Sequence, residues 1–370
     1  VSVNLLKQAS KEYLEIVVES YPYPISYKGQ YHYRSGATKQ ELKGAALDKF
    51  LLERQGKRWD GVPVPHVKLS DLNENAFFAF REQAAKSKRL TTETLQENNK
   101  SLLEKLHLVE GKLLKRAAIL LFHSDPEKFI TGAFIKIGYF KTDEDLQFQD
   151  TIHGHLFDQV KTTMDLLLTK YLKANIRYDG INRVEEYPFP EAALREALLN
   201  AVAHKDYSAG HPIQISVYDN KIIFWNEGEL PDQWTAKKLA LKHPSRPFNP
   251  DVASTFFRAG LIEAWGRGTL KMISECKQAG LPAPVFIADA ADITVEFKLN
   301  RFKTVEKTVE KTVEKILELI THDPTITIKK LQAETGLSRR GVEYNIDRLK
   351  SDGKLERIGP DKGGKWKIIP

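Results

Sequence analysis

Apolar and polar residues alternate with different periods along the chain, and each period predicts a different kind of element. Between Tyr21 and Pro65, aromatic residues at strand-like spacing give way to a helical spacing and then to a segment rich in Pro and Gly, which predicts a small α/β unit. From Asp71 to about Lys173 the apolar residues keep a mostly helical spacing, which a strand at 134–140 (FIKIGYF) interrupts. We interpret this second segment as a helical connector.

The pattern is most informative after Tyr187. Pro190 can occupy the first turn of a helix, and the residues that follow it are rich in Ala and Leu. Two alternating apolar runs come next in 213–231 (IQISVYDNKIIFWNEGELP), and the pair Asp219-Asn220 joins them. This predicts a hairpin that ends in a glycine turn.

The last fifth of the chain starts with a tetrapeptide repeat. TVEK occurs three times in succession at 304–315 and is followed by ILELI. The four-residue spacing places Val305, Val309 and Val313 nearly on one helical stripe. The stripe fits a helical linker, and it also fits a short coiled-coil seam that would pair two chains. Three repeats are too few to decide between these interpretations.

The residues after Thr325 predict a winged helix-turn-helix. Leu331 would anchor a short helix that ends at Gly336, and Ser338 can cap the helix that follows. Strand-like runs on either side of the turn 359–364 complete the wing. The buried face of the second helix repeats at i, i+4 and i+7, through Val342, Ile346 and Leu349.

Cations on this motif indicate a surface for DNA. In winged-helix regulators the second helix enters the major groove, its N-terminal residues reach base edges, and the wing contacts phosphates. Glu343 and Asp347 on the same helix leave open the alternative of a winged helix used for protein contacts. The predicted DNA-binding residues are Arg339, Arg340, Tyr344 and Arg348 on the helix, with Lys362 and Lys365 on the wing.

Composition and charge narrow the class of protein. The 370 residues are 41% hydrophobic and 28% charged, which is typical of a soluble globular chain and excludes a disordered tail or a fibre. The lone Cys276 excludes a disulfide framework and a multi-cysteine metal site within one chain. No run approaches the roughly 18 apolar residues of a membrane span, so we expect a cytoplasmic protein with no membrane contact. Residues 301–370 hold 16 Lys and Arg against 11 Asp and Glu, in a chain whose net charge is only +7, so any nucleic-acid surface must be local.

Three polar residues share one face of the helix predicted after Pro190. Glu196, Asn200 and His204 recur at i, i+4 and i+8 among apolar neighbours. Polar groups on such a face need partners such as a metal, a nucleotide or ordered water, unless the stripe faces solvent. Further along, Gly266-Arg-Gly268 precedes a helix-spaced segment, an arrangement that exposes backbone N–H groups to phosphate.

Together, and in this order, these elements resemble the GHKL ATPase superfamily of gyrase, Hsp-type chaperones, histidine kinases and mismatch-repair proteins. The resemblance implies an α/β sandwich that binds ATP and Mg²⁺. Glu196-Ala-Leu-Leu-Asn200 resembles the motif in which the glutamate polarises the attacking water and the asparagine helps to hold Mg²⁺. Asn226-Glu-Gly228 resembles the turn that contacts adenine, although most of these proteins have aspartate where this chain has Asn226. An amide oxygen can accept the same hydrogen bond without carrying charge.

The closest resemblance is to the divergent GHKL-like domain of proteins labelled RecG-like ATP-dependent helicases or transcriptional regulators. The segments NAVAHKDYS and WGRGTLKMI carry it, and it covers 187–299. A helicase of the P-loop type is excluded, because the only near match, 359–365, is followed by Trp366 and not by Ser or Thr. The resemblance implies a catalytic role for Glu196, a metal-binding role for Asn200, and nucleotide contacts from Asn200, His204, Asn226, Gly228, Gly266 and Gly268.

We therefore expect an α+β multidomain protein. Its N-terminal segment 31–65 (YHYRSGATKQELKGAALDKFLLERQGKRWDGVPVP) resembles the latter part of a Schlafen/AlbA-type domain. The expected function is a bacterial-type DNA-binding transcriptional regulator with an ATP-binding domain, for which a homodimer would suit paired half-sites. The alternatives are a nucleotide-hydrolysing enzyme that acts on nucleic acid, with weak ATPase activity, and a scaffold with a degenerate ATPase domain. The predicted parts are a partial Schlafen/AlbA-like domain (1–65), a mostly helical connector (66–180), a GHKL-like nucleotide-binding α/β sandwich (181–300), a TVEK-repeat helix or linker (301–320) and a winged helix-turn-helix (321–370).

Overall fold

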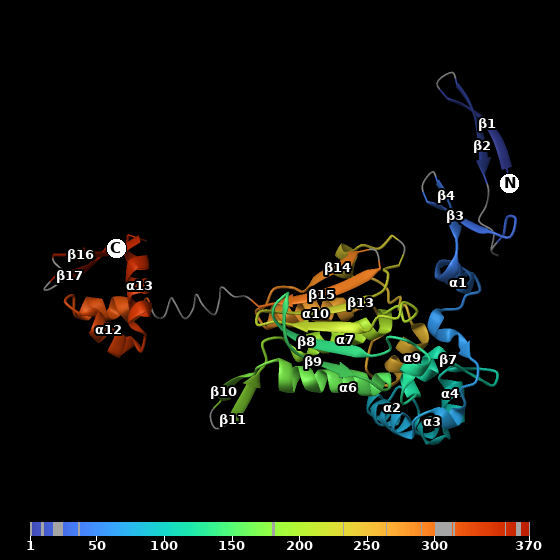
Figure 1. Ribbon diagram of the computed structural model, residues 1–370, viewed down its shortest axis with the longest axis horizontal. Helices are drawn as coiled ribbons and strands as arrows, with labels where there is room; N and C mark the ends of the chain where they lie inside the picture. The colour runs from blue at the N-terminus through green and yellow to red at the C-terminus, as the bar shows by residue number, and fades with distance from the viewer. Residues whose placement is uncertain are drawn as a thin grey trace. The chain divides into compact units, whose positions relative to one another are not determined.

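Figure 1 shows the computed structural model of the chain, which divides into two units, Val1–Leu299 and Asn300–Pro370. Val305 and Val309 of the predicted stripe lie outside the described residues, as do Lys362 and the side chain of Arg348. The structure describes residues 2–8, 11–17, 25–35, 38–179, 182–231, 233–263, 265–289, 291–299, 313, 315–351, 353–359 and 364–369.

A six-stranded sheet organises the first unit. Its strands are β8 (Ile135–Thr142), β9 (Asp145–Ile152), β12 (Ile213–Val217), β13 (Lys221–Glu227), β14 (Val285–Asp289) and β15 (Asp292–Lys298). Their order is β14-β15-β13-β12-β8-β9, with β12 parallel to β8 and the other neighbours antiparallel. Successive side chains of a strand point to opposite faces of the sheet, so every second residue faces the core. In β12 these buried residues are Ile213, Ile215 and Val217.

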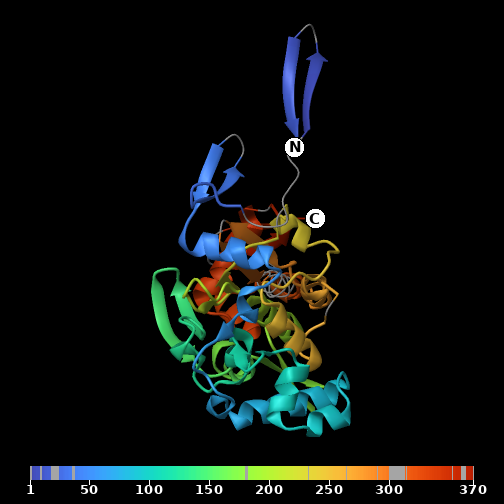
Figure 2. The same ribbon diagram turned by 90° about the vertical axis from the view of Figure 1, so that its right-hand side faces the viewer.

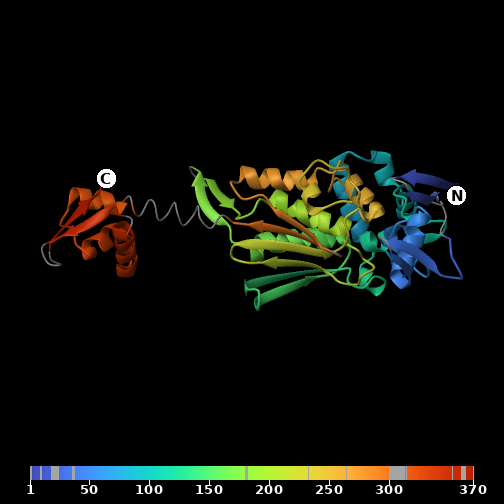
Figure 3. The ribbon, with the colours of Figure 1, turned by 90° about the horizontal axis from the view of Figure 1, so that it is seen from above.

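Helices of the described part of the chain cover the apolar face of this sheet. They are α6 (Leu156–Leu166), α7 (Glu191–His204) and α10 (Gly268–Gln278), which Figure 3 shows on one side of the strands. Apolar residues at helical spacing on α7, including Ala193, Leu194, Ala197 and Leu198, pack into the core with the strands. The first unit is therefore built around a two-layer α/β sandwich, as predicted.

The segment expected to be a connector is joined to this sandwich. Its strands β8 and β9 belong to the main sheet, and one hydrophobic core runs from Val67 to Phe297. The sheet is therefore continuous across the boundary expected near 180, since β8 pairs with β12 in parallel register. The helices of this segment, grouped in Figure 2, are α2 (Glu74–Ser87), α3 (Thr92–Gln96), α4 (Asn99–Lys105) and α5 (Arg116–Phe122).

Smaller elements complete the first unit. Near the N-terminus are two hairpins and a helix: β1 (Ser2–Gln8) with β2 (Lys11–Val17), β3 (Tyr31–Ser35) with β4 (Thr38–Leu42), and α1 (Gly44–Arg54). A three-stranded sheet has the order β5 (Pro63–Val64), β7 (Leu113–Lys115), β6 (Val109–Glu110). The remaining elements are the hairpin β10 (Asn175–Asp179) with β11 (Asn182–Glu186), the helices α8 (Ala236–Leu239) and α9 (Pro250–Arg258), the single turns η1 (Trp59–Gly61), η2 (Leu69–Asp71) and η3 (Pro126–Lys128), and the π-helical turn η4 (Leu167–Tyr171).

The second unit has its own small core. It contains a helix at 315–322, then α12 (Ile328–Thr335), α13 (Arg339–Ser351) and the hairpin β16 (Leu355–Ile358) with β17 (Lys365–Ile368). Gly336 ends α12 in the left-handed region, with φ at 72°, and Ser338 Oγ accepts a hydrogen bond from Gly341 N–H at the start of α13. The predicted face of α13 is buried, and its residues Val342, Ile346 and Leu349 pack with Leu331, Leu355 and Trp366.

The N-terminus of α9 is capped by a carboxylate from a distant part of the sequence. Asp60 Oδ2 accepts hydrogen bonds from the N–H groups of Asp251 (2.8 Å) and Val252 (3.0 Å). The Asp60 side chain is completely buried, and its Oδ1 has no hydrogen-bond partner among the described residues. Burial raises the pKa of Asp60 to about 7, with a smaller rise from Asp251, although the two N–H bonds and Lys115 favour the charged form.

This raised pKa predicts that the first unit loses stability as the pH rises. Between the unfolded pKa of 3.8 and the folded value near 7, the native state holds more protons than the unfolded state. The contribution of Asp60 to the free energy of unfolding should therefore fall through this window, by up to roughly 4 kcal/mol. Urea unfolding of the wild type and of Asp60→Asn, which cannot titrate, isolates the effect. A stability difference between them that stays constant from about pH 4 to 8 would contradict this assignment.

Candidate nucleotide pocket and DNA-binding surface

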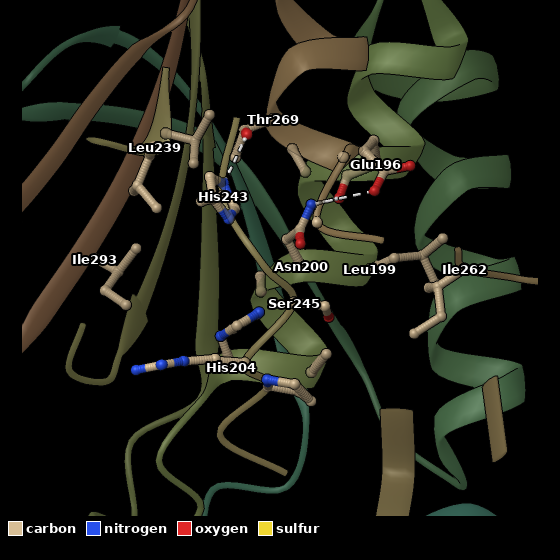
Figure 4. A pocket seen from close by; sticks show the side chains of 18 of the residues that line it. Glu196, Leu199, Asn200, His204, Leu239, His243, Ser245, Ile262, Thr269 and Ile293 are labelled. Carbon is tan, nitrogen blue, oxygen red and sulfur yellow. Dashed lines mark hydrogen bonds between the residues drawn. The ribbon is translucent and has the colours of Figure 1, made fainter. Parts of the chain in front are cut away.

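A pocket in the first unit lies where α7 passes the end of β13 and the start of α10, and Figure 4 shows its side chains. It encloses about 110 Å³. Part of its wall is apolar, with Leu199, Phe224, Ile262, Met272 and Ile293, and the rest is formed by polar side chains and glycine backbone. An apolar wall with a few convergent polar groups is typical of a small-molecule site.

The predicted polar stripe of α7 lines this pocket. Glu196, Asn200 and His204 are all half-buried, and all three face the same space. Asn200 Nδ2 donates hydrogen bonds to the backbone oxygen of Glu196 (2.8 Å) and to its Oε1 (3.3 Å), as Figure 4 shows. The stripe therefore presents a carboxylate and an amide side by side, one turn apart.

The environment of Glu196 favours its protonated form. Burial raises the pKa of this carboxyl group, whereas the positive charges of Lys271 and Arg195 and the hydrogen bond from Asn200 act in the opposite direction. Glu263 adds a smaller upward effect. A carboxylate whose proton affinity is raised in this way is a stronger base than one in water, which suits a group that orients and deprotonates a water molecule.

His204 is held as a neutral imidazole. Burial, with a smaller contribution from the neighbouring His243, lowers its pKa to about 4. His243 Nε2 lies 3.1 Å from Thr269 Oγ1, and its ring meets Trp234 edge to face at 5.0 Å. A neutral His204 can offer one donor and one acceptor to a ligand without adding charge to the pocket.

At two of the predicted glycines an added Cβ would overlap another part of the chain. Gly266 has a φ of +64°, and a Cβ there would overlap the carbonyl oxygen of His243. Gly268 is the first residue of α10, and a Cβ there would overlap Glu196 Oε1 and lie 3.0 Å from Asn200 Nδ2. The backbone at the start of α10 therefore approaches the carboxylate and the amide of α7 directly.

The other two predicted residues come from the end of β13. Asn226 is 3% exposed, lines the pocket and donates from Nδ2 to the backbone oxygen of Glu227 (3.1 Å). Gly228 is not part of the pocket wall. A Cβ on Gly228 would lie 2.7 Å from the carbonyl oxygen of His204, so this glycine lets the chain pass the C-terminus of α7.

The side chains of the pocket meet some, but not all, of the requirements for binding a nucleotide with Mg²⁺. Among the described residues no group of three or more His, Cys, Asp or Glu can hold a metal ion, so Asn200 would bind Mg²⁺ together with phosphates and water. Ligand pockets typically enclose roughly 300–1,000 Å³, more than this pocket does. The segment from His243 to Pro247 lines this pocket and lies against Gly266.

The segment from Leu230 to Pro247 contains none of the predicted site residues, yet it supplies much of the pocket wall. Trp234, His243 and Arg246 all line the pocket, and the Arg246 guanidinium lies 5.9 Å from the centre of the Trp234 ring. The segment contains one four-residue helix, α8, and therefore has no long hydrophobic period to detect. In the sequence, the feature that could have drawn attention to this segment is its aromatic and basic residues, which lie between prolines.

The predicted DNA-binding residues of the second unit lie on and beside α13. Arg339 and Arg340 are exposed in its first turn, and Arg339 Nε lies 2.8 Å from Glu343 Oε1. Tyr344 is 66% exposed, and Lys365 is exposed at the start of β17. The first turn of α13 therefore exposes two cations, and Tyr344 is exposed further along the same helix.

An ATPase-like α/β sandwich and a winged helix are the two classes of domain that this fold defines. Two matches to family models agree with this: residues 210–297 match "Putative ATP-dependent DNA helicase recG C-terminal", and residues 310–356 match "Winged helix-turn-helix DNA-binding". The chain therefore carries a RecG C-terminal-like ATPase domain and a winged-helix DNA-binding domain, as the sequence predicts. The first match begins after α7 and does not include Glu196, Asn200 or His204.

A solved structure has a similar overall fold. The DIP2311 protein from Corynebacterium diphtheriae is 18% identical to this chain, with a TM-score of 0.55, and the match covers 100% of this chain and 76% of that one. At this identity the likeness concerns the fold alone. No curated protein matches the chain. In the part of the chain that the structure describes, no helix is both long enough and apolar enough to cross a membrane.

Proposed function

We propose that this protein is a DNA-binding transcriptional regulator whose first unit binds ATP with Mg²⁺. The observation that carries the proposal is the pocket in which the carboxylate of Glu196, the amide of Asn200 and the backbone of Gly268 meet. In this proposal Asn200 helps to hold Mg²⁺, and the N–H groups near Gly266 and Gly268 face the phosphates. Asn226 and the neutral His204 contact the rest of the nucleotide.

The winged helix supplies the DNA contacts in this proposal. Arg339 and Arg340 reach base edges from the N-terminal part of α13, and Lys365 contacts phosphate from the wing. Tyr344 lies beside them on the exposed face of the same helix. A homodimer would place two such helices on paired half-sites, and ATP would act as the effector that changes DNA affinity.

A second candidate function is a weak nucleotide-hydrolysing enzyme acting on nucleic acid. The observation in its favour is the buried carboxyl group of Glu196, whose raised pKa suits a general base. A Glu196→Ala variant separates the two candidates, because it removes the base and keeps the rest of the pocket. Regulation and DNA binding that survive in this variant support the regulator. Their loss while ATP still binds supports the enzyme.

The proposal predicts that Arg340→Ala weakens DNA binding. In an anisotropy titration of the full chain with a mixed-sequence duplex, we expect this variant to lower the affinity about threefold to tenfold, because it removes a cation from the N-terminal part of α13. Lys277→Ala is the matched control, since Lys277 is an exposed cation on α10 of the first unit. Equal losses in both variants would contradict a DNA surface on α13. ATP with Mg²⁺ that leaves the affinity of the wild type unchanged would contradict its role as effector.

A further inference from the structure

Helix α9 is held at its N-terminal end by residues that come far earlier in the chain. Asp60 caps the helix through the N–H groups of Asp251 and Val252. Lys115 Nζ lies 3.0 Å from Asp251 Oδ2, and both side chains of this ion pair are largely buried. Asp60 belongs to η1 and Lys115 to β7, so both precede the main sheet in sequence.

The C-terminal end of α9 is held in the same way. Ser87 Oγ donates to the backbone oxygen of Arg258 (2.9 Å), and a Cβ on Gly260, whose φ is +81°, would lie only 2.5 Å from the Ser87 Cβ. Arg89 Nη1 donates to the backbone oxygens of Phe257 (2.6 Å) and Ile262 (2.7 Å). The Arg89 guanidinium also lies 4.1 Å from the centre of the Phe257 ring. One side chain from the α2–α3 loop therefore fixes the backbone at two points.

The helix and the loops at its two ends form one wall of the pocket. Pro247, Ala253, Ile262 and Glu263 all line it, and the chain then continues directly to Gly266 and Gly268. A shift of α9 would therefore displace the glycine backbone that approaches Glu196.

The residue before α9 also ties this wall to α7. Asn249 N–H donates to the backbone oxygen of Ala203 (3.0 Å), and Asn249 Nδ2 donates to that of Lys205 (2.7 Å). Asn249 is completely buried. The carbonyl groups at the C-terminus of α7, next to His204, are therefore bonded to the segment that Asp60 caps.

We propose that Asp60 and Arg89 are positioning residues for the nucleotide pocket, holding α9 so that its flanking loops meet α7 at the right distance. This inference rests on the proposed nucleotide binding. If Asp60 and Arg89 hold α9 in this way, nucleotide affinity depends on the segment from Asp60 to Lys115. This segment lies outside the residues that match the RecG C-terminal family. The side chains act through α9 and need not touch the nucleotide.

A purely architectural role for these residues makes a different prediction. If Asp60 only stabilised the fold, its loss would lower the unfolding temperature and leave the affinity of the folded protein unchanged. The matched control is Asn73→Ala, because Asn73 caps α2 by the same kind of bond, accepting from Asn75 N–H at 2.8 Å. Asn73 is not among the residues of the pocket wall.

The test is a titration of the full chain with a fluorescent ATP analogue and Mg²⁺, at a temperature where every variant is folded. We expect Asp60→Ala and Arg89→Ala to raise the Kd about tenfold, which corresponds to the loss of one helix cap or one pair of hydrogen bonds. Asp60→Asn should stay within about twofold of the wild type, since its amide oxygen can still accept both N–H bonds. A Kd for Asp60→Ala that equals the Kd of Asn73→Ala would overturn the inference.

A second measurement does not depend on nucleotide. Hydrogen exchange of the backbone amides in 257–269 should be faster in Asp60→Ala and Arg89→Ala than in the wild type, and unchanged in Asn73→Ala. Equal exchange in all variants overturns the inference even if nucleotide binds. A wild type that binds no nucleotide refutes the proposed function, and the exchange data then still decide whether Asp60 and Arg89 hold this wall.

Discussion

Replacing Gly268 with alanine should abolish the stabilisation of the first unit by ATP and Mg²⁺. A Cβ at this position overlaps Glu196 Oε1 and lies 3.0 Å from Asn200 Nδ2, so the carboxylate and the amide must both move. The Glu196 side chain is flexible, so the displacement costs the fold little while it disrupts the proposed phosphate and metal contacts. Ligand at about 100 times its Kd stabilises a native state by about 2.7 kcal/mol, which is the effect that should disappear.

Thermal unfolding with and without millimolar ATP and Mg²⁺ measures this loss. Ser274→Ala is the matched control, since it changes an exposed position on the same helix and should keep the full shift. Asn200→Ala should lose the shift as Gly268→Ala does, because it removes the amide proposed to hold Mg²⁺. A Gly268→Ala protein that keeps the full shift would show that this contact is not part of a nucleotide site.

Replacing Trp366 with alanine should unfold the second unit and abolish DNA binding. The Trp366 side chain is 7% exposed, its Nε1 donates to the backbone oxygen of Ile326 (3.2 Å), and the Arg357 guanidinium lies 4.4 Å from its ring. Removing a buried aromatic side chain costs about 3–5 kcal/mol, which is a large part of the stability of any small domain. The core of this unit has few members to share that loss.

Circular dichroism during thermal unfolding of the full chain can follow this change. We expect Trp366→Ala to lose the helical signal of the second unit at low temperature while the first unit keeps its transition. Tyr344→Ala is the control, because Tyr344 is 66% exposed and its removal should leave the unit folded. A Trp366→Ala protein with an unchanged transition and unchanged DNA affinity would mean that the wing does not stabilise this domain.

Local periodicity was sufficient to predict the elements that carry the candidate site. The stripe of Glu196, Asn200 and His204 on α7 and the buried face of α13 each repeat within a single helix, so spacing alone reveals which side chains share a face. Gly266 and Gly268 were also recognisable, because the helix that follows them has a clear period. These features depend on residues that are close in sequence.

Contacts between distant segments were not predictable in the same way. The pairing of β8 with β12 and the cap that Asp60 places on α9 join residues with no shared period. Gly228 shows the related difficulty: its motif is correctly placed at the end of β13, but the glycine is needed for the close passage of α7 and is not part of the pocket wall. A motif identifies a type of residue, and only packing shows what that residue contacts.

The continuous sheet of the first unit limits how this protein can be rearranged by recombination. β12 lies between β13 and β8, so a gene fragment beginning near 181 would leave the edge of β12 and the apolar side chains beside it uncovered. The ATPase-like half can therefore be inherited or transplanted only with the residues from Val67 onward that complete its core. The winged helix has a core of its own, and none of its members belongs to the core of the first unit. Evolution is therefore freer to change what the protein binds through its C-terminal unit than to divide the unit that carries the pocket.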